Sequence, residues 1–245
     1  TEGVEISTMA DIPSTGSGLG SSSSVTVGLL NAFYVYQGIS QTAETLAKEA
    51  CEIEIDVLGK PIGKQDQYAA AYGGLNYIQF NADETVEVHP IQMREETKKE
   101  LEGNLLMFYT GITRKSETIL KEQKKNVPNK LEILDQMREQ AVRMRRFLEH
   151  ANNDDLDVFG HELHKGWQLK KQLARGITLN IIDRYYEAAI RNGALGGKIC
   201  GAGGGGFLLL YCKKENQDKV RRALRDLKEV KFKFEPEGSK IIYKD

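Results

Sequence analysis

Hydrophobic positions recur with helical spacing along most of the chain and with strand-like spacing in shorter runs. Helical periodicity predicts helices over 20–37, 42–58, a segment from Gln67, and 113–125, 130–150, 156–174, 179–192 and 215–228. Apolar or alternating runs predict strands at 4–10, 75–80, 85–91, 105–111, a segment from Phe207, 230–236 and 239–244. Helices and strands mixed in this order predict an α+β fold with antiparallel sheets.

The first two helices have clear apolar stripes. Offsets of four, seven, eight and eleven place Val25, Leu29, Ala32, Phe33 and Tyr36 on one face of the first helix. The stripe of the second helix consists of Ala43, Leu46, Ala47, Ala50, Ile53 and Val57. We therefore expect these two helices to lie against a core.

Glu54 lies within the stripe of the second helix, between Ala50 and Val57. A carboxylate in a buried position needs a cation, because removing its water costs several kcal/mol. One interpretation is a structural salt bridge. The other is Mg²⁺, which favours one or two carboxylates together with phosphate oxygens.

A Gly/Ser-rich loop, IPSTGSGLGSSSSVTVGLL at 12–30, joins the first predicted strand to the first predicted helix. A flexible linker is usually flanked by unrelated polar sequence, and this loop is not. The N-terminus of the helix, near Gly20, offers unpaired N–H groups and a positive dipole end to a phosphate, with a hydroxyl from Ser21 or Ser22. The alternative is a Ser-rich N-cap with a glycine hinge. Neither the dinucleotide fingerprint nor the P-loop fingerprint is present.

Asp66 follows a loop rich in Gly and Pro and begins a helix of small residues. It is either an N-cap, for which Asp is a favoured residue, or a group that accepts a proton from a substrate hydroxyl. Lys64 is either a solvated lysine or a cation that keeps Asp66 ionised or contacts a phosphate.

The segment GAGGGGF at 201–207 places four consecutive glycines directly before a buried strand. Glycine costs backbone entropy, so such a run indicates a close backbone approach. The neighbour is either a ligand or the first glycine loop, crossing beside it.

Composition limits the function classes. The chain has 245 residues and a net charge of -1, which suit one large or two small domains and exclude a strong general attraction to nucleic acid or to a membrane surface. The apolar run FLLLYC is too short to span a bilayer. Three widely spaced cysteines and no visible secretion leader indicate a cytoplasmic protein with reduced thiols.

Together these motifs resemble the GHMP kinase superfamily of sugar and small-alcohol kinases. PSTGSGLGSS, from Pro13 to Ser22, resembles its phosphate loop, and KICGAGGGGF, from Lys198 to Phe207, resembles its C-terminal glycine motif. Glu54 lies twelve residues before Asp66, as in the galactokinase-like members. The resemblance covers nearly the whole chain.

Within the superfamily, three segments look most like the D-glycero-D-manno-heptose 7-phosphate kinases. They are IEIDVLGKPIGKQDQYAAAYGGLNYIQF from Ile53, FYTGITRKS from Phe108 and LHKGWQLKKQLARGIT from Leu163. This resemblance implies transfer of a phosphoryl group from ATP to the anomeric hydroxyl of a heptose phosphate. The alternatives are a fucokinase-like or galactokinase-like enzyme, a non-catalytic sugar- or nucleotide-binding member, and a folded fragment that needs a further segment.

The resemblance also implies the architecture. It gives a ribosomal-protein-S5-like N-terminal domain, truncated here, over 1–100 and a ferredoxin-like C-terminal domain over 101–245. The chain opens at Thr1 within an apparent strand, and nothing matches the family's N-terminal strand and loop rich in Arg and Gly. We therefore expect a segment upstream. A homodimer is left open, and the expected partner is a small sugar phosphate rather than nucleic acid or a membrane.

Site residues follow from the same resemblance. The ATP phosphates are expected at Pro13, Gly16, Ser17, Gly18, Leu19, Gly20, Ser21 and Ser22. Ser22 or Ser21 and Glu54 are expected to position Mg²⁺, and Asp66 to accept or orient the proton of the sugar hydroxyl. Lys64, Gly203, Gly204, Gly205 and Arg114 are expected to bind the substrate.

The remaining polar groups carry weaker signals. Arg114, Lys165 and Lys171 are either solvated charges or ligands of the substrate's distal phosphate. The four histidines show no metal spacing and are interpreted as surface or packing residues. Trp167 is expected in the core rather than as a platform for a sugar.

Overall fold

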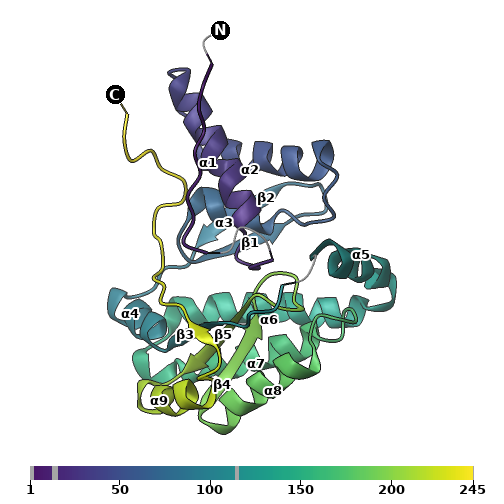
Figure 1. Ribbon diagram of the computed structural model, residues 1–245, viewed down its shortest axis with the longest axis vertical. Coiled ribbons are helices and arrows are strands. Elements are labelled where there is room, and N and C mark those ends of the chain that lie inside the picture. Colours follow the sequence, from purple (N-terminus) through teal and green to yellow (C-terminus); the bar gives the residue numbers. More distant parts are fainter. Residues whose placement is uncertain (1–2, 13–15, 114–115, 245) are drawn as a thin grey trace.

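The computed structural model describes residues 3–12, 16–113 and 116–244 (Figure 1). Its helices are α1 Ser21–Tyr36, α2 Ala43–Cys51, α3 Gln65–Tyr72, α4 Glu95–Gly103, α5 Ser116–Asn126, α6 Leu131–His150, α7 Asp157–Lys170, α8 Asn180–Arg191 and α9 Lys214–Ala223. Its strands are β1 Asn76–Phe80, β2 Val86–Pro90, β3 Leu105–Tyr109, β4 Ala194–Ile199, β5 Phe207–Cys212 and β6 Lys228–Glu229. A π-helix, Glu52–Val57, continues α2, and two 3₁₀ turns, Val127–Asn129 and Asn153–Asp155, precede α6 and α7. Most predicted helices are therefore confirmed.

Two antiparallel sheets divide the molecule into an upper and a lower half (Figure 1). In the upper half, β1 pairs with β2 beside α1, α2 and α3. In the lower half, four strands lie in the order β4-β5-β3-β6, with α7 and α8 against β4. Leu105 pairs with Tyr211 and Tyr109 with Phe207, which fixes the register of the two central strands. The predicted α+β class with antiparallel sheets is confirmed.

Each half has its own hydrophobic core. In the lower half, Trp167 and Ile182 pack with Leu208 and Leu210 of β5. In the upper half, Val27 of α1 packs with a cluster from α2 and α3 that includes Leu46 and Tyr68. Trp167 is only 1% exposed, so the expectation that it lies in the core is confirmed.

The apolar stripe predicted for α1 does not face a core. Phe33 is 41% and Tyr36 70% exposed, while Ser23, Val27 and Asn31 are buried. The small and polar face is the buried one because its polar groups find partners there. Asn31 donates to the backbone oxygen of Ser239, 3.2 Å away, in the C-terminal tail.

Several strand predictions near the chain ends are wrong. Residues 4–10 form no strand among the described residues and are exposed. The predicted strands at 230–236 and 239–244 are also absent. Pairing beyond β3 is limited to β6, Lys228–Glu229, and one bond from the Val230 N–H to the Met107 oxygen at 2.8 Å. Alternation alone does not make a strand where no neighbouring strand supplies hydrogen bonds.

The opposite error occurs at 194–199, which is not among the predicted strands but forms strand β4. The reason lies in helix packing. A Cβ on Gly196 would overlap with the backbone oxygen of Gly160 in α7. Glycine therefore allows α7 to lie directly on the sheet, a constraint that turn propensity does not reveal.

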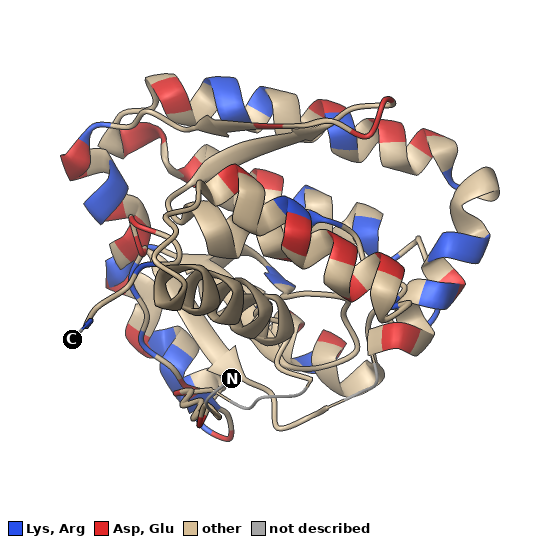
Figure 2. Cartoon of the chain, turned by 90° about the horizontal axis from the view of Figure 1, so that it is seen from above, with Lys and Arg blue, Asp and Glu red and all other residues tan. Residues whose placement is uncertain are grey.

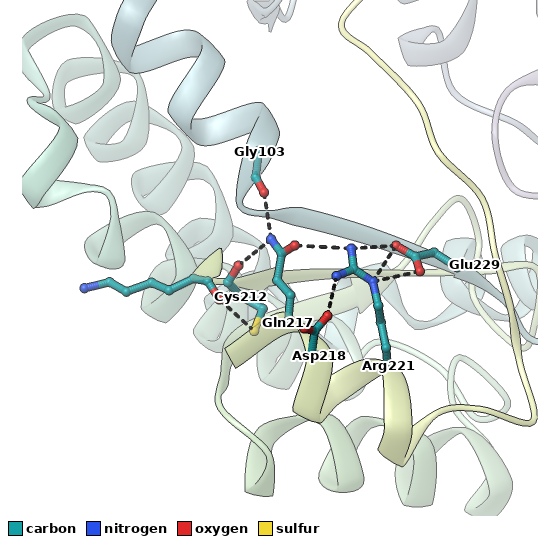
Figure 3. Close-up of polar contacts among 7 residues, drawn as sticks. Gly103, Cys212, Gln217, Asp218, Arg221 and Glu229 are labelled. Carbon is teal, nitrogen blue, oxygen red and sulfur yellow. Dashed lines mark hydrogen bonds and ion pairs between the residues drawn. The ribbon is translucent and has the colours of Figure 1, made fainter. Parts of the chain in front are cut away.

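Polar contacts attach α9 to the sheet (Figure 3). Gln217 donates to the backbone oxygens of Gly103, at 2.7 Å, and Cys212, at 3.1 Å. Arg221 binds Glu229 of β6 with Nε to Oε2 at 2.9 Å and Nη2 to Oε1 at 3.0 Å. This two-pronged contact holds the short edge strand in place, because both guanidinium bonds share one planar geometry.

The tail after β6 returns to the upper half (Figure 1). The Gly74 N–H donates to the backbone oxygen of Glu235 at 2.6 Å, and the Phe234 N–H donates to Glu102 at 2.7 Å. Acidic and basic positions are intermingled along the helices (Figure 2). Within the described ranges, no helix is long and apolar enough to cross a bilayer.

Candidate active site

Helix α1 begins at a loop of left-handed glycines. Gly16, Gly18 and Gly20 have φ angles of 69°, 74° and 69°, a region that side chains rarely adopt. Gly20 is the N-cap, and no side chain caps the helix. The predicted alternative of a serine N-cap is therefore wrong. The first turn also contains no acidic residue, so its N–H groups and positive dipole end are available to an anion.

The serines after the loop take part in a local network. Ser17 is buried, and its hydroxyl lies 2.9 Å from that of Ser21 and 3.3 Å from the Leu19 N–H, which donates to it. Ser22 and Ser23 instead point across to Glu54. The segment Gly16–Ser22 thus has a fixed conformation, which suits a phosphate cradle better than a hinge.

The two glycine-rich loops cross in direct contact. A Cβ on Gly18 would lie 2.5 Å from the Cys200 oxygen, and one on Gly206 would overlap with the Ser17 oxygen. Of the two explanations predicted for the glycine run, the structure supports the crossing of the first loop.

The predicted substrate residues Gly203, Gly204 and Gly205 lie in this crossing region. The Gly204 N–H is already bonded to the Ile177 oxygen at 2.8 Å. A Cβ on Gly205 would overlap with the Ile112 oxygen. Their conformation is thus explained by packing, and a contact with substrate stays a prediction.

Glu54 lies at the centre of the upper half, fully buried. It accepts hydrogen bonds from the Ser22 hydroxyl, from Ser23 at 2.6 Å and from Gln67 Nε2 at 2.7 Å, and Lys60 Nζ lies 2.8 Å from Oε1. Burial alone would raise its pKa, but the bonds from Lys60 and the serines together outweigh burial and lower it. Glu54 is therefore ionised at neutral pH.

The π-helix explains how Glu54 reaches this place. Residues Glu52–Val57 have wider turns than the α-helix that the periodicity predicts, and the register shifts. Val57, expected in the buried stripe, is 72% exposed as a result. Insertions of this kind are frequent at functional sites.

Asp66 lies in the first turn of α3, beside the loop. The helix N-cap is Lys64, so the predicted alternative of an N-cap aspartate is wrong. A Cβ on Gly20 would be 3.4 Å from Cβ and Cγ of Asp66. Asp66 is exposed as a residue, but the crowding around its carboxyl raises its pKa, and the charge of Glu54 adds to this. The structure thus brings Asp66 and Glu54 to the same end of α1.

Two lysines of the lower half offset part of the rise in the pKa of Asp66. The positive charges of Lys170 and Lys198 act to lower the pKa of Asp66. Lys170 donates to the backbone oxygen of Gly201 in the second glycine loop. Burial and the charge of Lys198 lower the pKa of Lys170 to about 8.

Other predicted residues lie elsewhere. Lys64 pairs with Glu84 in the β1–β2 turn rather than with Asp66. Lys165 pairs with Glu162 at 2.6 Å, and Lys171 lies 3.6 Å from Asp183. The predicted residues Pro13 and Arg114 lie outside the described residues.

Sequence reasoning missed Lys60, Lys170 and Lys198. Lys198 begins the glycine motif KICGAGGGGF, and this was the only available signal. Lys60 precedes a proline in an ordinary loop, and Lys170 is one of two adjacent lysines. Only the fold shows which of these two faces the site.

The donor set at the end of α1 fits a magnesium ion. Ser22 and Glu54 provide a hydroxyl and a carboxylate oxygen, and Mg²⁺ takes one or two such ligands together with phosphate oxygens and water. Lys60 Nζ lies 2.6 Å from Ser22 Oγ and 2.8 Å from Glu54 Oε1, so these two oxygens already face one cation together. Within the described part of the chain, no cluster of three His, Cys, Asp or Glu side chains offers a metal site of another kind.

Family models match both halves of the chain. The model for the GHMP kinase N-terminal domain matches residues 2–74, and that for the GHMP kinase C-terminal domain matches residues 144–229. The chain belongs to the GHMP kinase family. The first match contains the phosphate loop, Glu54 and Asp66, and the second contains Lys170, Lys198 and the glycine run.

Curated relatives and solved structures agree with this assignment. The chain is 34% identical to the D-glycero-alpha-D-manno-heptose 7-phosphate kinase of Campylobacter jejuni over 95% of this chain and 69% of that protein. A crystal structure of a D-glycero-D-manno-heptose 1-phosphate kinase from Bacteroides thetaiotaomicron matches with a TM-score of 0.69 and 28% identity, over 91% of this chain and 63% of that one.

More distant members share the fold. The mevalonate kinase of Methanococcus jannaschii matches with a TM-score of 0.67 and 23% identity, over 91% of this chain and 65% of that one. The chain is also 29% identical to the L-fucokinase/L-fucose-1-P guanylyltransferase of Bacteroides fragilis, over 86% of this chain but 22% of that protein. The chain thus spans from about a fifth to about two thirds of the length of these relatives. The expected GHMP kinase fold is confirmed.

Proposed function

We propose that the protein is an ATP-dependent kinase that phosphorylates the anomeric hydroxyl of a heptose phosphate, such as D-glycero-D-manno-heptose 7-phosphate. The observation that carries this proposal is the convergence of Ser22, Glu54 and Asp66 at the uncapped end of α1. The 34% identity to the Campylobacter jejuni heptose 7-phosphate kinase supports the choice of acceptor.

The nucleotide phosphates bind at the end of α1 in this mechanism. The first-turn N–H groups and the dipole of α1 attract the triphosphate, and the residues Gly16–Ser22 wrap around it. Ser22 and Glu54 hold Mg²⁺, which neutralises charge on the phosphate oxygens when bound. Phosphoryl transfer depends mainly on placement and charge neutralisation, so this cradle supplies most of the acceleration.

Asp66 acts on the acceptor. Its carboxylate accepts the proton of the anomeric hydroxyl while the hydroxyl oxygen forms a bond to the γ-phosphorus and the bond to ADP breaks. The crowded surroundings that raise the pKa of Asp66 make it a stronger base than an ordinary aspartate. Lys170 and Lys198, which act in the opposite direction, limit this rise and keep the carboxylate ionised.

Two further assignments accompany this proposal. The boundary between the two domains lies near residue 100, between the β1–β2 sheet and strand β3. The protein works in the cytoplasm, where ATP is available and where Cys51, Cys200 and Cys212, all free, would remain reduced.

A kinase assay of the protein at its full natural length tests the function. The acceptors are D-glycero-D-manno-heptose 7-phosphate, the corresponding 1-phosphate, fucose and galactose, and ³¹P NMR identifies the phosphorylated position. We expect a 1,7-bisphosphate from the 7-phosphate, with Asp66→Asn as the background control. Preferential turnover of fucose or galactose would indicate a fucokinase-like or galactokinase-like enzyme instead. Nucleotide binding without transfer to any acceptor would indicate a non-catalytic member.

A further inference from the structure

A cavity of about 200 Å³ lies between α6 and α7 in the lower half of the molecule. Lys170 from the end of α7 and Lys198 from β4 contribute to its wall, together with Trp167 and Gln140. Much of the remaining wall is apolar and includes Met137, Met144 and Leu163. The proposed function does not otherwise use this cavity.

The polar atoms of the cavity are mostly donors. Trp167 is 1% exposed, and its Nε1–H is buried without a hydrogen-bond partner in the described part of the chain. A buried donor without a partner is uncommon in a folded protein, because it loses its bonds to water. This donor has almost no accessible surface, so Trp167 meets the cavity with its ring carbons rather than with its N–H.

The two lysines have no acidic partner. Among the described residues, neither Lys170 nor Lys198 forms an ion pair, and the charge of Lys198 lowers the pKa of Lys170. The charge of Asp66 acts on both lysines and offsets part of their mutual repulsion, but it forms no ion pair with either of them among the described residues. A bound anion would relieve this repulsion.

The one carboxylate in the wall, Glu162, is already engaged. Its Oε2 accepts from Gln140 Nε2 at 2.8 Å, and its Oε1 pairs with Lys165 at 2.6 Å. It therefore opposes an anion only weakly. Gln140 also donates to the Glu162 backbone oxygen, so its amide hydrogens are used as well.

The cavity is adjacent to the proposed reaction centre. Lys170 donates to the Gly201 oxygen, and Gly201 lies against Gly18 of the phosphate loop. Lys170 and Lys198 also act electrostatically on Asp66. A ligand could thus place one end in the cavity and the other at Asp66.

We propose that Lys170 and Lys198 bind the phosphate group that the acceptor sugar already carries, in the cavity whose wall includes the Trp167 ring. This inference rests on the proposed function and identifies the part of the site that distinguishes a sugar phosphate from a free sugar. Lys165 and Lys171, neighbours of these residues in sequence, pair instead with Glu162 and Asp183, and their predicted contact with the phosphate stays a prediction. A phosphate dianion matches two cations, and the apolar wall strengthens these bonds by excluding water.

Trp167 provides a direct test, because it is the only tryptophan of the 245 residues. Its fluorescence is titrated, without nucleotide, with heptose 7-phosphate, the unphosphorylated heptose and inorganic phosphate. We expect a saturable change with the sugar phosphate, a weaker one with inorganic phosphate and none with the free heptose. If heptose 7-phosphate leaves the Trp167 fluorescence unchanged, the assignment is wrong.

Variants locate the binding groups. Lys170→Met and Lys198→Met should each weaken binding of the sugar phosphate about 10- to 100-fold, because each removes a charge-assisted bond. Lys124→Met, at an exposed position of α5, is the matched control and should bind like the parent. Trp167→Phe, followed by calorimetry, should weaken binding less than either lysine variant. Thermal unfolding of each variant checks that it folds.

A binding measurement with an ATP analogue distinguishes the phosphate of the sugar from the terminal phosphoryl group of ATP. If the lysines bind the terminal phosphoryl group of ATP instead, Lys170→Met will weaken binding of a non-hydrolysable ATP analogue and leave that of the sugar phosphate unchanged. That result would overturn this inference while leaving the kinase function in place. Conversely, a protein that binds the sugar phosphate through these lysines but transfers no phosphoryl group would refute the proposed function alone.

Discussion

Replacing Glu54 with Gln tests whether the ionised carboxylate organises the end of α1. The substitution keeps the shape of the side chain and removes its charge. One oxygen becomes an amide nitrogen, which cannot accept a hydrogen bond, so either the bond from Ser22 at Oε1 or the bonds from Ser23 and Gln67 at Oε2 are lost. The ion pair with Lys60 is lost at the same time.

The magnitude follows from these contacts. A hydrogen bond to a charged group contributes about 1.5–3 kcal/mol, and removing one partner of a buried ion pair costs about 3–5 kcal/mol. The Lys60 side chain is 30% exposed and regains water when Glu54 is neutral, so the lower part of this range applies. We expect Glu54→Gln to lower the free energy of unfolding by roughly 2–3 kcal/mol.

Urea unfolding at pH 7 measures the change. With a slope of about 2–3 kcal/mol per M, the midpoint should fall by roughly 1 M. Glu52→Gln is the matched control, since Glu52 lies exposed in the same π-helix. Its urea midpoint should differ from that of the parent by no more than a few tenths of 1 M. Equal midpoints for Glu54→Gln and Glu52→Gln would refute the reasoning.

The pH dependence gives a second readout of the same variant. The pKa of Glu54 is lowered in the folded state from an ordinary value of 4.5, so its contribution to stability is present above 4.5. That contribution is lost as the pH falls through the lower folded-state pKa. The stability difference between the parent and Glu54→Gln should therefore shrink below pH 4.5. A difference that stays constant down to pH 3 would contradict an ionised Glu54.

Other substitutions test the base and the loop crossing. Asp66→Asn should lower kcat by about 10²- to 10⁴-fold without changing nucleotide affinity, as measured by turnover and calorimetry. Because the pKa of Asp66 is raised from 3.8, kcat/KM of the parent should decline on the acid side at a pH above 3.8, and a decline only below it would contradict the assignment. Gly206→Ala, with φ at +82° and its Cβ against the Ser17 oxygen, should lower the free energy of unfolding by more than about 1 kcal/mol in urea. Gly28→Ala, in the open interior of α1, should raise it by about 0.5–1 kcal/mol, and opposite signs would refute the packing argument.

The sequence predicts the local features of this protein well. Amphipathic periods locate most helices, and the apolar runs at 75–80, 85–91 and 105–111 form β1, β2 and β3 where predicted. These predictions succeed because each depends on the residues of one segment. The chemistry at the ends of α1 and α3 also follows from local motifs, which place Ser22 and Asp66 in first turns.

Features that depend on distant partners are predicted poorly. The apolar face of α1 is exposed because the opposite face meets Glu54 and the C-terminal tail. The strand β4 forms at a Gly-rich segment because α7 requires glycine at Gly196. In both cases the deciding residue lies far along the chain, so no window of local sequence contains the information.

The candidate site shows the same division. Glu54 is found from sequence because an acid within an apolar stripe is unusual, and Asp66 is found through the resemblance to the GHMP kinases. The lysines are not, since an exposed lysine is the common case and nothing local separates Lys170 from Lys171. One helical step decides between them: Lys171 lies 3.6 Å from Asp183, and Lys170 reaches Gly201.

The glycine run links these observations. Gly18 lies against the Cys200 oxygen, and Gly206 lies against Ser17, so the Gly/Ser loop of the upper half is in backbone contact with the loop between β4 and β5 of the lower half. Lys198 lies two residues before Cys200 in the same segment. The close crossing that requires glycine therefore also sets how near the cation of Lys198 comes to Asp66. A side chain at Gly18 would separate the two loops and move the charge of Lys198 away from Asp66, so the spacing of the motif determines the electrostatics of the site as well as its shape.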